Sequence, residues 1–196
     1  MDGDKISVSI KEAAQQLFRR YGYHKTSVNE IAAKANLAKA TIYKYFESKE
    51  LILNVIIMDY LEKHIKELAQ KYSPDGQDKA EVIADKVLRV SRLTYIACNE
   101  FIGWEFIRES VNAQAFLKKL SDEIEELLLD TFAQARTTPP DEGVIKRMRF
   151  LINASKSIVF SFAFTSVSDA DVKKNFIKFR NDILPYLIKG ALSSED

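Results

Sequence analysis

The chain has 196 residues, which is enough for one domain or for two unequal domains. Hydrophobic residues make up 46% of it and charged residues 29%, which excludes general disorder, while only six Gly and four Pro argue against collagen-like and turn-dense all-β folds. A single Cys excludes an internal disulfide framework and a Cys-based zinc site, and two His leave little material for a metal site, so we expect no cofactor.

The net charge of +1 indicates no partner by itself, but the charges are unevenly distributed. Between residues 11 and 49, eight Lys and Arg residues outnumber three acidic residues, so this window carries +5 and the remainder −4. This asymmetry predicts an anionic partner near the N-terminus. Residues 1–9 lack the apolar core of a secretion signal, and the apolar stretch 51–58 is far shorter than the ~20 residues that cross a bilayer. We therefore expect a cytoplasmic protein with no membrane contact.

The N-terminal segment predicts an amphipathic helix that ends near Gly22. Its apolar positions recur three and four residues apart: Ile6, Ile10, Ala13, Ala14, Leu17, Phe18 and Tyr21. Ser27 and Glu30 then form a capping-box pattern, which predicts the start of a short second helix. Asn36 tolerates the left-handed conformation, so residues 35–38 are expected to form a tight turn.

The chain after that turn also favours helices. We expect a short helix over 39–46, a longer one over 49–71 that Ser48 caps, and further helices over 79–99, 100–110, 113–135, 142–167 and 169–192. Breaks at 72–76 and 137–141 are rich in Pro, Gly, Asp, Ser or Thr. The alternation in 160–165 is typical of a strand, but a lone strand is not stable, so a helix is favoured. The sequence predicts an all-α fold of about nine helices.

Two short helices joined by a tight turn predict a helix-turn-helix. The expected anchors of this unit are Ile31, Ala32, Leu37, Ile42 and Phe46, and its outward positions are Lys39, Ala40, Thr41, Tyr43, Lys44 and Tyr45. Lys suits phosphate or guanine, hydroxyls suit phosphate, and Ala or the Thr methyl can touch a thymine methyl. Tyr43 and Tyr45 could instead be core residues, but the surrounding Lys residues favour a DNA contact.

The stretch 17–51, LFRRYGYHKTSVNEIAAKANLAKATIYKYFESKEL, resembles the tetracycline-repressor (TetR) family of bacterial regulators. The matching positions are Leu17-Phe18, Gly22-Tyr23, Thr26-Ser27-Val28, Ile31-Ala32, Ala35, Lys39, Thr41-Ile42-Tyr43, Tyr45-Phe46 and Ser48-Lys49-Glu50. The match is specific because the spacing holds over the whole stretch, although it covers only the first part of the chain.

The resemblance implies a homodimer with an N-terminal three-helix helix-turn-helix domain, residues 1–50, that binds double-stranded operator DNA. A larger C-terminal helical domain, residues 51–196, would bind a small-molecule effector and form the dimer. Thr26 or Ser27 resembles the phosphate contact at the start of the second helix, and Lys49 the one that opens the fourth. The recognition-helix contacts would be Lys39, Thr41, Tyr43, Lys44 and Tyr45.

Three positions depart from the family pattern. Asn36 stands where the turn usually carries Gly, and Ala38 and Ala40 stand where Ser and Gly are common. Without a hydroxyl, residue 38 loses a helix cap and a possible phosphate contact. Ala38 and Ala40 therefore keep open an alternative, a helical small-molecule binding protein with impaired or lost DNA binding.

The C-terminal part is rich in aromatic residues, with ten of the twelve Phe from Phe101 onward. An apolar pocket would be lined by Tyr95, Cys98, Phe101, Trp104, Phe106, Phe132, Met148 and Phe160. The last two helices would form a four-helix dimer interface through Ser155, Ile158, Val159, Phe162, Val172, Phe176, Phe179 and Ile183. The alternative for any one of these residues is an ordinary core position. The acidic run Glu123, Glu125 and Glu126 is typical of a solvated helix face.

These features together predict a ligand-responsive, sequence-specific DNA-binding transcriptional regulator, expected to be a repressor that a small apolar or aromatic effector releases from DNA. No Gly-rich phosphate loop, metal-ligand spacing or Ser–His–Asp order is present, so the sequence gives no reason to expect an enzyme.

Overall fold

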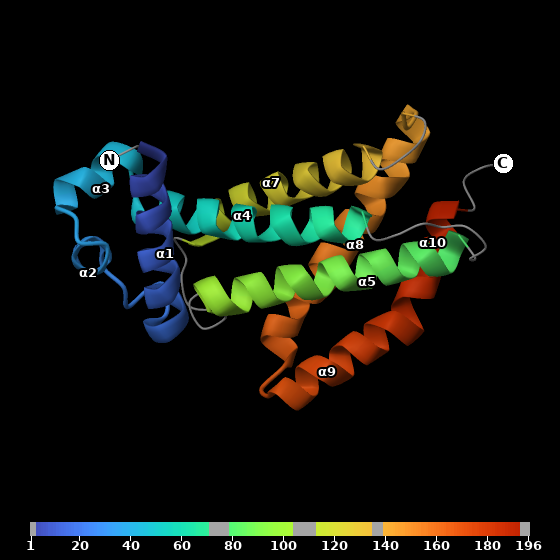
Figure 1. The fold of residues 1–196 in the computed structure, drawn as a ribbon. Helices are drawn as coiled ribbons and strands as arrows, with labels where there is room; N and C mark the ends of the chain where they lie inside the picture. Colours follow the sequence, from blue (N-terminus) through green and yellow to red (C-terminus); the bar gives the residue numbers. More distant parts are fainter. Residues whose placement is uncertain (1–2, 71–78, 104–112, 135–138, 193–196) are drawn as a thin grey trace. The chain divides into compact units, whose positions relative to one another are not determined.

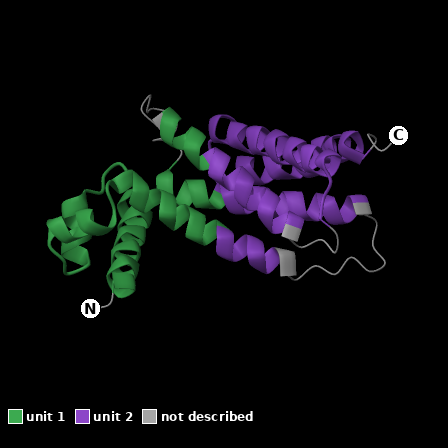
Figure 2. Cartoon of the chain, turned by 90° about the horizontal axis from the view of Figure 1, so that it is seen from above, with its two compact units in different colours: residues 1–61, 96–120 green, residues 62–95, 121–196 purple. Residues whose placement is uncertain are grey.

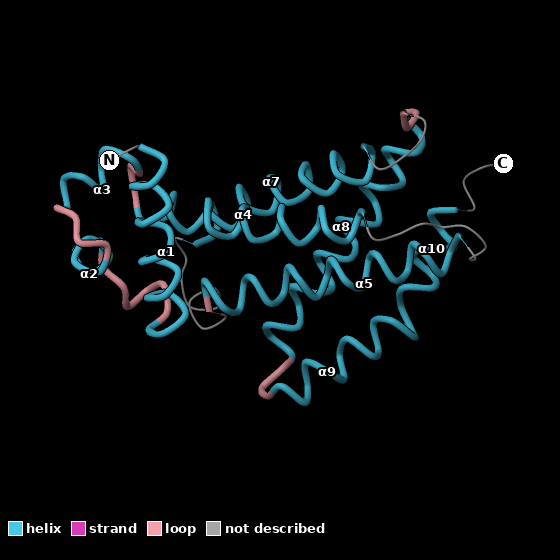
Figure 3. The backbone as a smooth tube through the Cα atoms, viewed as in Figure 1, coloured by secondary structure: helices cyan, strands magenta, loops and turns pink. Residues whose placement is uncertain are grey.

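The computed structural model describes residues 3–70, 79–103, 113–134 and 139–192, and the regular structure within these ranges is helical (Figure 1). Figure 3 shows helices joined by loops, with no strand among the described residues. The predicted all-α fold is confirmed. The stretch 160–165, where a strand-like alternation competed with a helix, forms the end of α8 (Glu142–Thr165).

The chain divides into two compact units, which Figure 2 distinguishes by colour. Unit 1 comprises residues 1–61 and 96–120, and unit 2 comprises residues 62–95 and 121–196. The helices α4 (Lys49–Gln70), α5 (Lys79–Ala97) and α7 (Ala113–Gln134) each contribute residues to both units. The functional boundary expected after residue 50 stays a prediction. Of the helices described, none has the length and hydropathy needed to cross a membrane.

Unit 1 begins with α1 (Gly3–Tyr21), whose predicted apolar stripe lies in the core at Ile10, Ala13, Ala14 and Phe18, whereas Tyr21 at the end of the helix is exposed. Ile10, Ala14 and Phe18 are almost fully buried. Gly22 ends the helix with φ of +83°, a left-handed conformation that Gly adopts without the steric cost of a side chain. The predicted helix end is thus confirmed, and its cause is the absence of a Cβ at that residue.

The next two helices form the predicted helix-turn-helix. The helix α2 (Val28–Lys34) begins after Ser27 with a complete capping box, and α3 (Lys39–Tyr45) follows a tight turn. Asn36 has φ of +54° in that turn, which confirms the left-handed conformation expected there. The helix α3 ends one residue earlier than predicted because Phe46 has extended backbone angles and caps it.

Residues 98–102, which follow α5 in the chain, also belong to unit 1 and contact α1. The helix α5 ends in a π-helical turn, η1 (Cys98–Ile102), in place of the predicted α-helix through residue 99. Arg19 of α1 forms an ion pair with Glu100 at 3.0 Å, and its guanidinium lies 5.1 Å from the ring centre of Phe101. Phe101 is fully buried and meets Tyr60 edge-on at 5.6 Å between ring centres.

Unit 2 contains an aromatic core in which α8 contacts α9 (Asp169–Lys178) and α10 (Leu184–Leu192). Phe176 meets Phe162 and Tyr95 edge-on, with ring centres 5.1 Å and 5.7 Å apart. Arg92 lies over the Phe176 ring at 5.6 Å. Edge-on aromatic pairs add about 0.5–1.5 kcal/mol each beyond the area that they bury.

The single helix expected over 169–192 is interrupted by a π-helical turn, η2 (Phe179–Ile183). Pro185 lies two residues beyond this turn, and proline lacks the backbone N–H that would continue regular α-helical bonding. The Leu184 amide donates to the Phe179 carbonyl, the wider spacing of a π turn. The chain before Pro185 therefore forms a locally widened helix.

Candidate nucleic-acid interface

The two faces of α3 differ sharply in exposure. Ile42 is fully buried and Phe46 is 5% exposed, so both anchor the helix to the core of unit 1 as predicted. Lys39, Ala40 and Lys44 are exposed on the surface, and Tyr43 and Tyr45 are 47% and 37% exposed; Thr41 is half-buried. The structure thus brings all six outward candidates together on one short helix.

The two tyrosines of α3 have different surroundings. Tyr45 lies beside the first turn of α1, where a Cβ placed on Gly3 would meet the Tyr45 hydroxyl at 3.8 Å. Tyr43 is the more exposed of the two. The geometry therefore leaves Tyr43 freer to meet a partner, whereas part of Tyr45 lies against unit 1.

The start of α2 distinguishes between Thr26 and Ser27, which the sequence left open as alternatives. Thr26 is 2% exposed and its hydroxyl donates to the Gly22 carbonyl at 2.9 Å, so this side chain is committed to the turn. Ser27 is exposed, and its Oγ accepts the Glu30 amide at 3.2 Å. Of the two candidates, only Ser27 presents its side chain at the surface.

The Glu30 carboxylate completes this cap. It accepts the Ser27 amide and the Ser27 hydroxyl, both at 2.7 Å. These hydrogen bonds, the one from the backbone amide first, hold the pKa of Glu30 below its usual value. Any anion at this end of α2 must therefore share the helix terminus with a carboxylate.

Lys49 opens α4 and turns inward instead of pointing into solvent. Its Nζ donates to the carbonyls of Tyr23 at 2.9 Å and Thr26 at 2.8 Å. It also lies 4.2 Å from the ring centre of Tyr23. Burial lowers the pKa of this ammonium group, against the opposing charges of Glu50 and Glu30. Two of its three N–H donors are thus taken, which leaves at most one for the predicted phosphate contact.

The neighbouring Glu50 accepts a hydrogen bond from the side chain of Tyr23, whose backbone carbonyl binds Lys49. Tyr23 is 4% exposed and its hydroxyl donates to Glu50 Oε1 at 2.8 Å. Burial raises the pKa of Tyr23, and the Glu50 charge adds to this shift. Burial alone would raise the pKa of Glu50, but hydrogen bonds, chiefly the one from Tyr23, outweigh it and lower that pKa.

The predicted effector residues fall in different parts of the chain. Tyr95, Phe132, Met148 and Phe160 belong to unit 2, Cys98 and Phe101 belong to unit 1, and Trp104 and Phe106 lie outside the described residues. Phe160 is 40% exposed, whereas Tyr95 and Phe101 are buried. Cys98 is partly buried as a residue, yet burial of its thiol raises the pKa to about 12, as expected for a structural cysteine.

The residues predicted to form the dimer interface all belong to unit 2, and most of them are buried in its core. Ser155, Val159, Phe162, Phe176 and Phe179 are buried within the subunit, while Ile158, Val172 and Ile183 are half-buried. Residues buried this way support the fold of their own subunit. Other side chains of α8 are on the surface instead, including three large aromatic ones: Phe150, Phe160 and Phe164.

Sequence reasoning missed the inward position of Lys49 and the Tyr23–Glu50 hydrogen bond. These residues are about 25 positions apart along the chain, and no periodic pattern links positions on separate elements. It also misplaced Glu125, which is not on a solvated face: it is 8% exposed and paired with Arg149 and Lys156. The nearby cations on α8 were visible in the sequence, but only the fold reveals that they meet α7.

Comparison with known proteins agrees with this geometry. Residues 10–56 match the family described as bacterial regulatory proteins, tetR family. The fatty acid metabolism regulator protein of Bacillus subtilis (strain 168) is 24% identical over 187 residues, covering 93% of this chain and 94% of that protein. YuxN, an HTH-type transcriptional regulator of the same organism, is 43% identical over 54 residues, which are 28% of this chain and 19% of that one.

A solved structure shares the whole fold. A TetR transcriptional regulator from Rhodococcus sp. RHA1 superimposes with a TM-score of 0.62 at 18% identity, covering 98% of this chain and 97% of that one. The helix-turn-helix geometry, the family match over residues 10–56 and this fold lead to the same assignment. Residues 10–56 carry the DNA-binding segment of the tetR family, the fold is similar to that of a TetR transcriptional regulator, and the chain is a DNA-binding transcriptional regulator.

Proposed function

We propose that α3 enters the major groove of an operator and that the protein acts there as a repressor. The observation that carries the proposal is the division of α3 into a buried apolar face and an exposed face with Lys and Tyr. A helix of this length, about 10 Å at ~1.5 Å per residue, fits a groove ~12 Å wide.

The proposed contacts divide into two kinds. Lys39, Lys44 and Tyr43 would bind phosphates, and Ser27 would do so once its hydroxyl turns from the Glu30 carboxylate to the DNA. Such contacts hold the helix in place without reading sequence. Ala40 and Thr41 lie in the first turn of α3, and their methyl groups suit thymine. Base preference would therefore depend on the first turn of the helix and affinity mainly on the charges.

The proposed dimer forms through the exposed stripe of α8. Phe150, Phe160 and Phe164 are 48%, 40% and 56% exposed, and the polar residues Asn153, Ser157 and Ser161 on the same stripe are also on the surface. Phe160 and Phe164 touch, with ring centres 5.7 Å apart. Exposed apolar groups in such numbers favour contact with a second copy, since a two-fold axis would pair this stripe with itself.

The proposed effector is a small apolar or aromatic molecule bound in unit 2, where Tyr95, Phe132 and Met148 are candidates to line the site. The name of the Bacillus subtilis relative points to fatty acid metabolism, so a fatty acyl group is the first class to test. An effector releases the operator only if it binds better to the conformation that cannot bind DNA.

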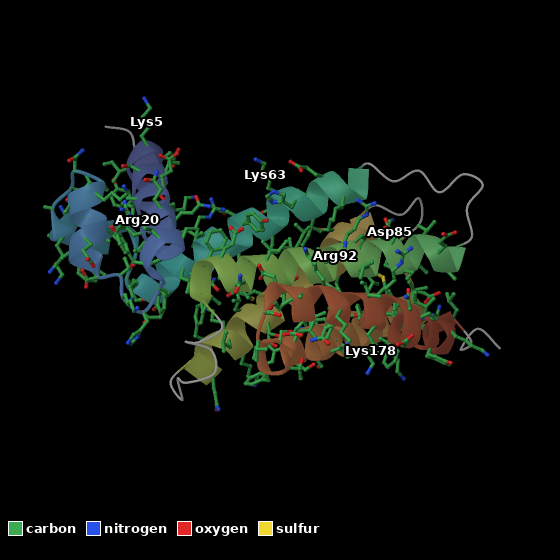
Figure 4. All side chains as sticks on the ribbon, turned by 90° about the horizontal axis from the view of Figure 1, so that it is seen from below. Lys5, Arg20, Lys63, Asp85, Arg92 and Lys178 are labelled. Atoms are coloured by element: carbon green, nitrogen blue, oxygen red, sulfur yellow. The ribbon has the colours of Figure 1, made fainter. Side chains whose placement is uncertain are left out.

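The test is fluorescence anisotropy with labelled duplexes taken from the DNA upstream of the protein's own gene. Lys44→Ala should weaken binding to every duplex and reduce the slope of log K against log salt by about one per subunit. Lys178→Ala removes a lysine from α9 in unit 2 (Figure 4) and should change neither quantity. Equal binding of upstream and shuffled duplexes by the wild type would refute specific regulation.

A further inference from the structure

The segment between α1 and α2 is held by side chains instead of regular helical bonds. It contains Gly22 in the left-handed conformation and leads directly to Ser27. The carbonyls of Gly22, Tyr23 and Thr26 accept hydrogen bonds from side chains, the first from Thr26 Oγ1 and the other two from Lys49 Nζ. The backbone of this turn therefore depends on the first residue of α4.

The first two residues of α4 hold both the backbone and the side chain of the turn. Lys49 bridges two carbonyls and covers the Tyr23 ring, while Glu50 accepts the Tyr23 hydroxyl. The Tyr23 ring also meets Phe18 of α1 in an edge-on arrangement, with the ring centres 5.4 Å apart. We name Lys49, Tyr23 and Glu50 the turn clamp.

We propose that the turn clamp positions Ser27 and the start of α2 for the DNA phosphate, and that Lys49 is a positioning residue instead of a phosphate contact. The inference rests on the proposed function, because it takes Ser27 as the group that meets the backbone of DNA. If Lys49 swung out to a phosphate, the Tyr23 and Thr26 carbonyls would lose their charged donor and the Tyr23 ring its cation.

Salt dependence separates the two roles. A lysine that neutralises a phosphate releases counterions, so its removal lowers the salt slope, whereas the loss of a positioning residue lowers affinity at every salt concentration alike. Lys49→Met keeps the aliphatic stem and removes the donors. It should weaken operator binding by about tenfold or more while the slope stays that of the wild type.

Two variants serve as references for this measurement. Lys44→Ala should lower the slope by about one per subunit. Lys63→Met makes the same chemical change on an exposed part of α4, where Lys63 extends away from the helix (Figure 4), and should alter neither affinity nor slope. A slope for Lys49→Met that falls as it does for Lys44→Ala would overturn the proposal, and so would an unchanged affinity.

A second variant keeps the test decisive if Lys49→Met folds poorly. Tyr23→Phe retains the ring and both Lys49 hydrogen bonds and removes only the hydroxyl that Glu50 accepts. Tyr23 is buried and cannot touch DNA, so a clamp predicts weaker operator binding, by a few-fold, with an unchanged slope. A purely stabilising role predicts unchanged affinity at temperatures where circular dichroism shows the variant fully folded.

Amide hydrogen exchange in the absence of DNA measures how firmly the turn clamp holds the backbone. This measurement does not depend on the proposed function. Tyr23→Phe should speed exchange of the Thr26, Ser27 and Val28 amides relative to the wild type, whereas Lys44→Ala should not. Unchanged exchange at these amides would overturn the clamp even if operator binding is specific. Non-specific binding by the wild type, with faster exchange in Tyr23→Phe, would refute the proposed function and leave the clamp intact.

Discussion

At the scale of single residues, Glu125 shows how unit 2 holds a buried charge. Its carboxylate on α7 accepts hydrogen bonds from Arg149 and from Lys156, both on α8. Lys156 also donates to the carbonyl and hydroxyl of Ser121 at 3.0 Å each. Burial alone would raise the pKa of Glu125, but the bonds from Lys156 and Arg149 outweigh it and lower that pKa.

This depressed pKa predicts a loss of stability in acid. The stabilisation is fully present above the unfolded-state pKa of about 4.3 and is lost as pH falls through the lower folded-state pKa. Glu125→Gln should therefore lower the free energy of unfolding at pH 7 by on the order of 2 kcal/mol and weaken its decline below pH 4.3. Thermal unfolding at pH 7, 5, 4 and 3 measures both effects. Equal melting temperatures of the two proteins at pH 7 would refute the buried pair.

Local residue patterns were predictable from the sequence, and long-range ones were not. Ser27 and Glu30 are three positions apart, so the capping box depends on adjacent backbone alone. Lys49 and Glu125 form contacts that exist only once separate helices meet. For both residues the sequence indicated solvent or DNA, the common place for a charged side chain, and burial against specific partners overrode that expectation.

At the scale of elements, α3 is a helix without a side-chain cap. Ala38 precedes it in an extended conformation and makes no side-chain cap hydrogen bond, as the missing hydroxyl predicts. The helix nevertheless forms, since Ile42 and Phe46 fasten one face to the core. Tertiary contacts therefore hold this short element, because isolated helices below ~12 residues are marginal in water.

Because α3 lacks a side-chain cap, a substitution that supplies one should increase stability and operator affinity. Ala38→Ser should raise the free energy of unfolding by about 1 kcal/mol, because Ser at this position can accept an otherwise free amide of α3. The added hydroxyl should also strengthen operator binding by a few-fold, as it orders the helix and offers a phosphate contact. Ala40→Ser adds the same group inside the helix and is the matched control for stability. Chemical denaturation and anisotropy measure the two effects, and a destabilised Ala38→Ser would contradict the account.

The helices were predictable because helical periodicity is strong along the chain. Two interruptions of these helices were not predictable. The π-helical turns η1 and η2 insert one extra residue into a helix, which no three- or four-residue spacing signals. Pro185 marked the neighbourhood of η2 in the sequence. The turn η1 contains no proline that would indicate its position in the sequence. The burial of Phe101 and the ion pair between Glu100 and Arg19 could be identified only from the structure.

At the scale of the whole molecule, the regulatory account requires two copies of α3. The interface predicted from sequence named residues that lie inside unit 2, because apolar spacing identifies a helix face without telling which neighbour covers it. The exposed stripe of α8 is the remaining candidate surface on that helix. It carries large side chains that a single subunit leaves in contact with water.

If the exposed stripe of α8 forms the dimer interface, one substitution on it should change the oligomeric state. Phe164→Glu places a charge on the most exposed aromatic residue of the proposed interface and should convert the dimer to a monomer in analytical ultracentrifugation, because a buried charge without a partner is costly. Operator affinity should fall with it, since one subunit reaches only one half-site. Lys118→Glu changes an exposed position of α7 and should remain dimeric. A dimeric Phe164→Glu would exclude this stripe from the interface.

If two symmetric copies of α3 enter the major groove of an operator, dimethyl sulfate footprinting should detect both of them. Guanine N7 lies in the major groove, so its protection from methylation reports what enters that groove. We expect two protected clusters on the operator, centred about 10 base pairs or a multiple of this apart, and Lys44→Ala should weaken the protection of both. Guanine methylation that the bound wild-type protein leaves unchanged would show that α3 does not enter the major groove.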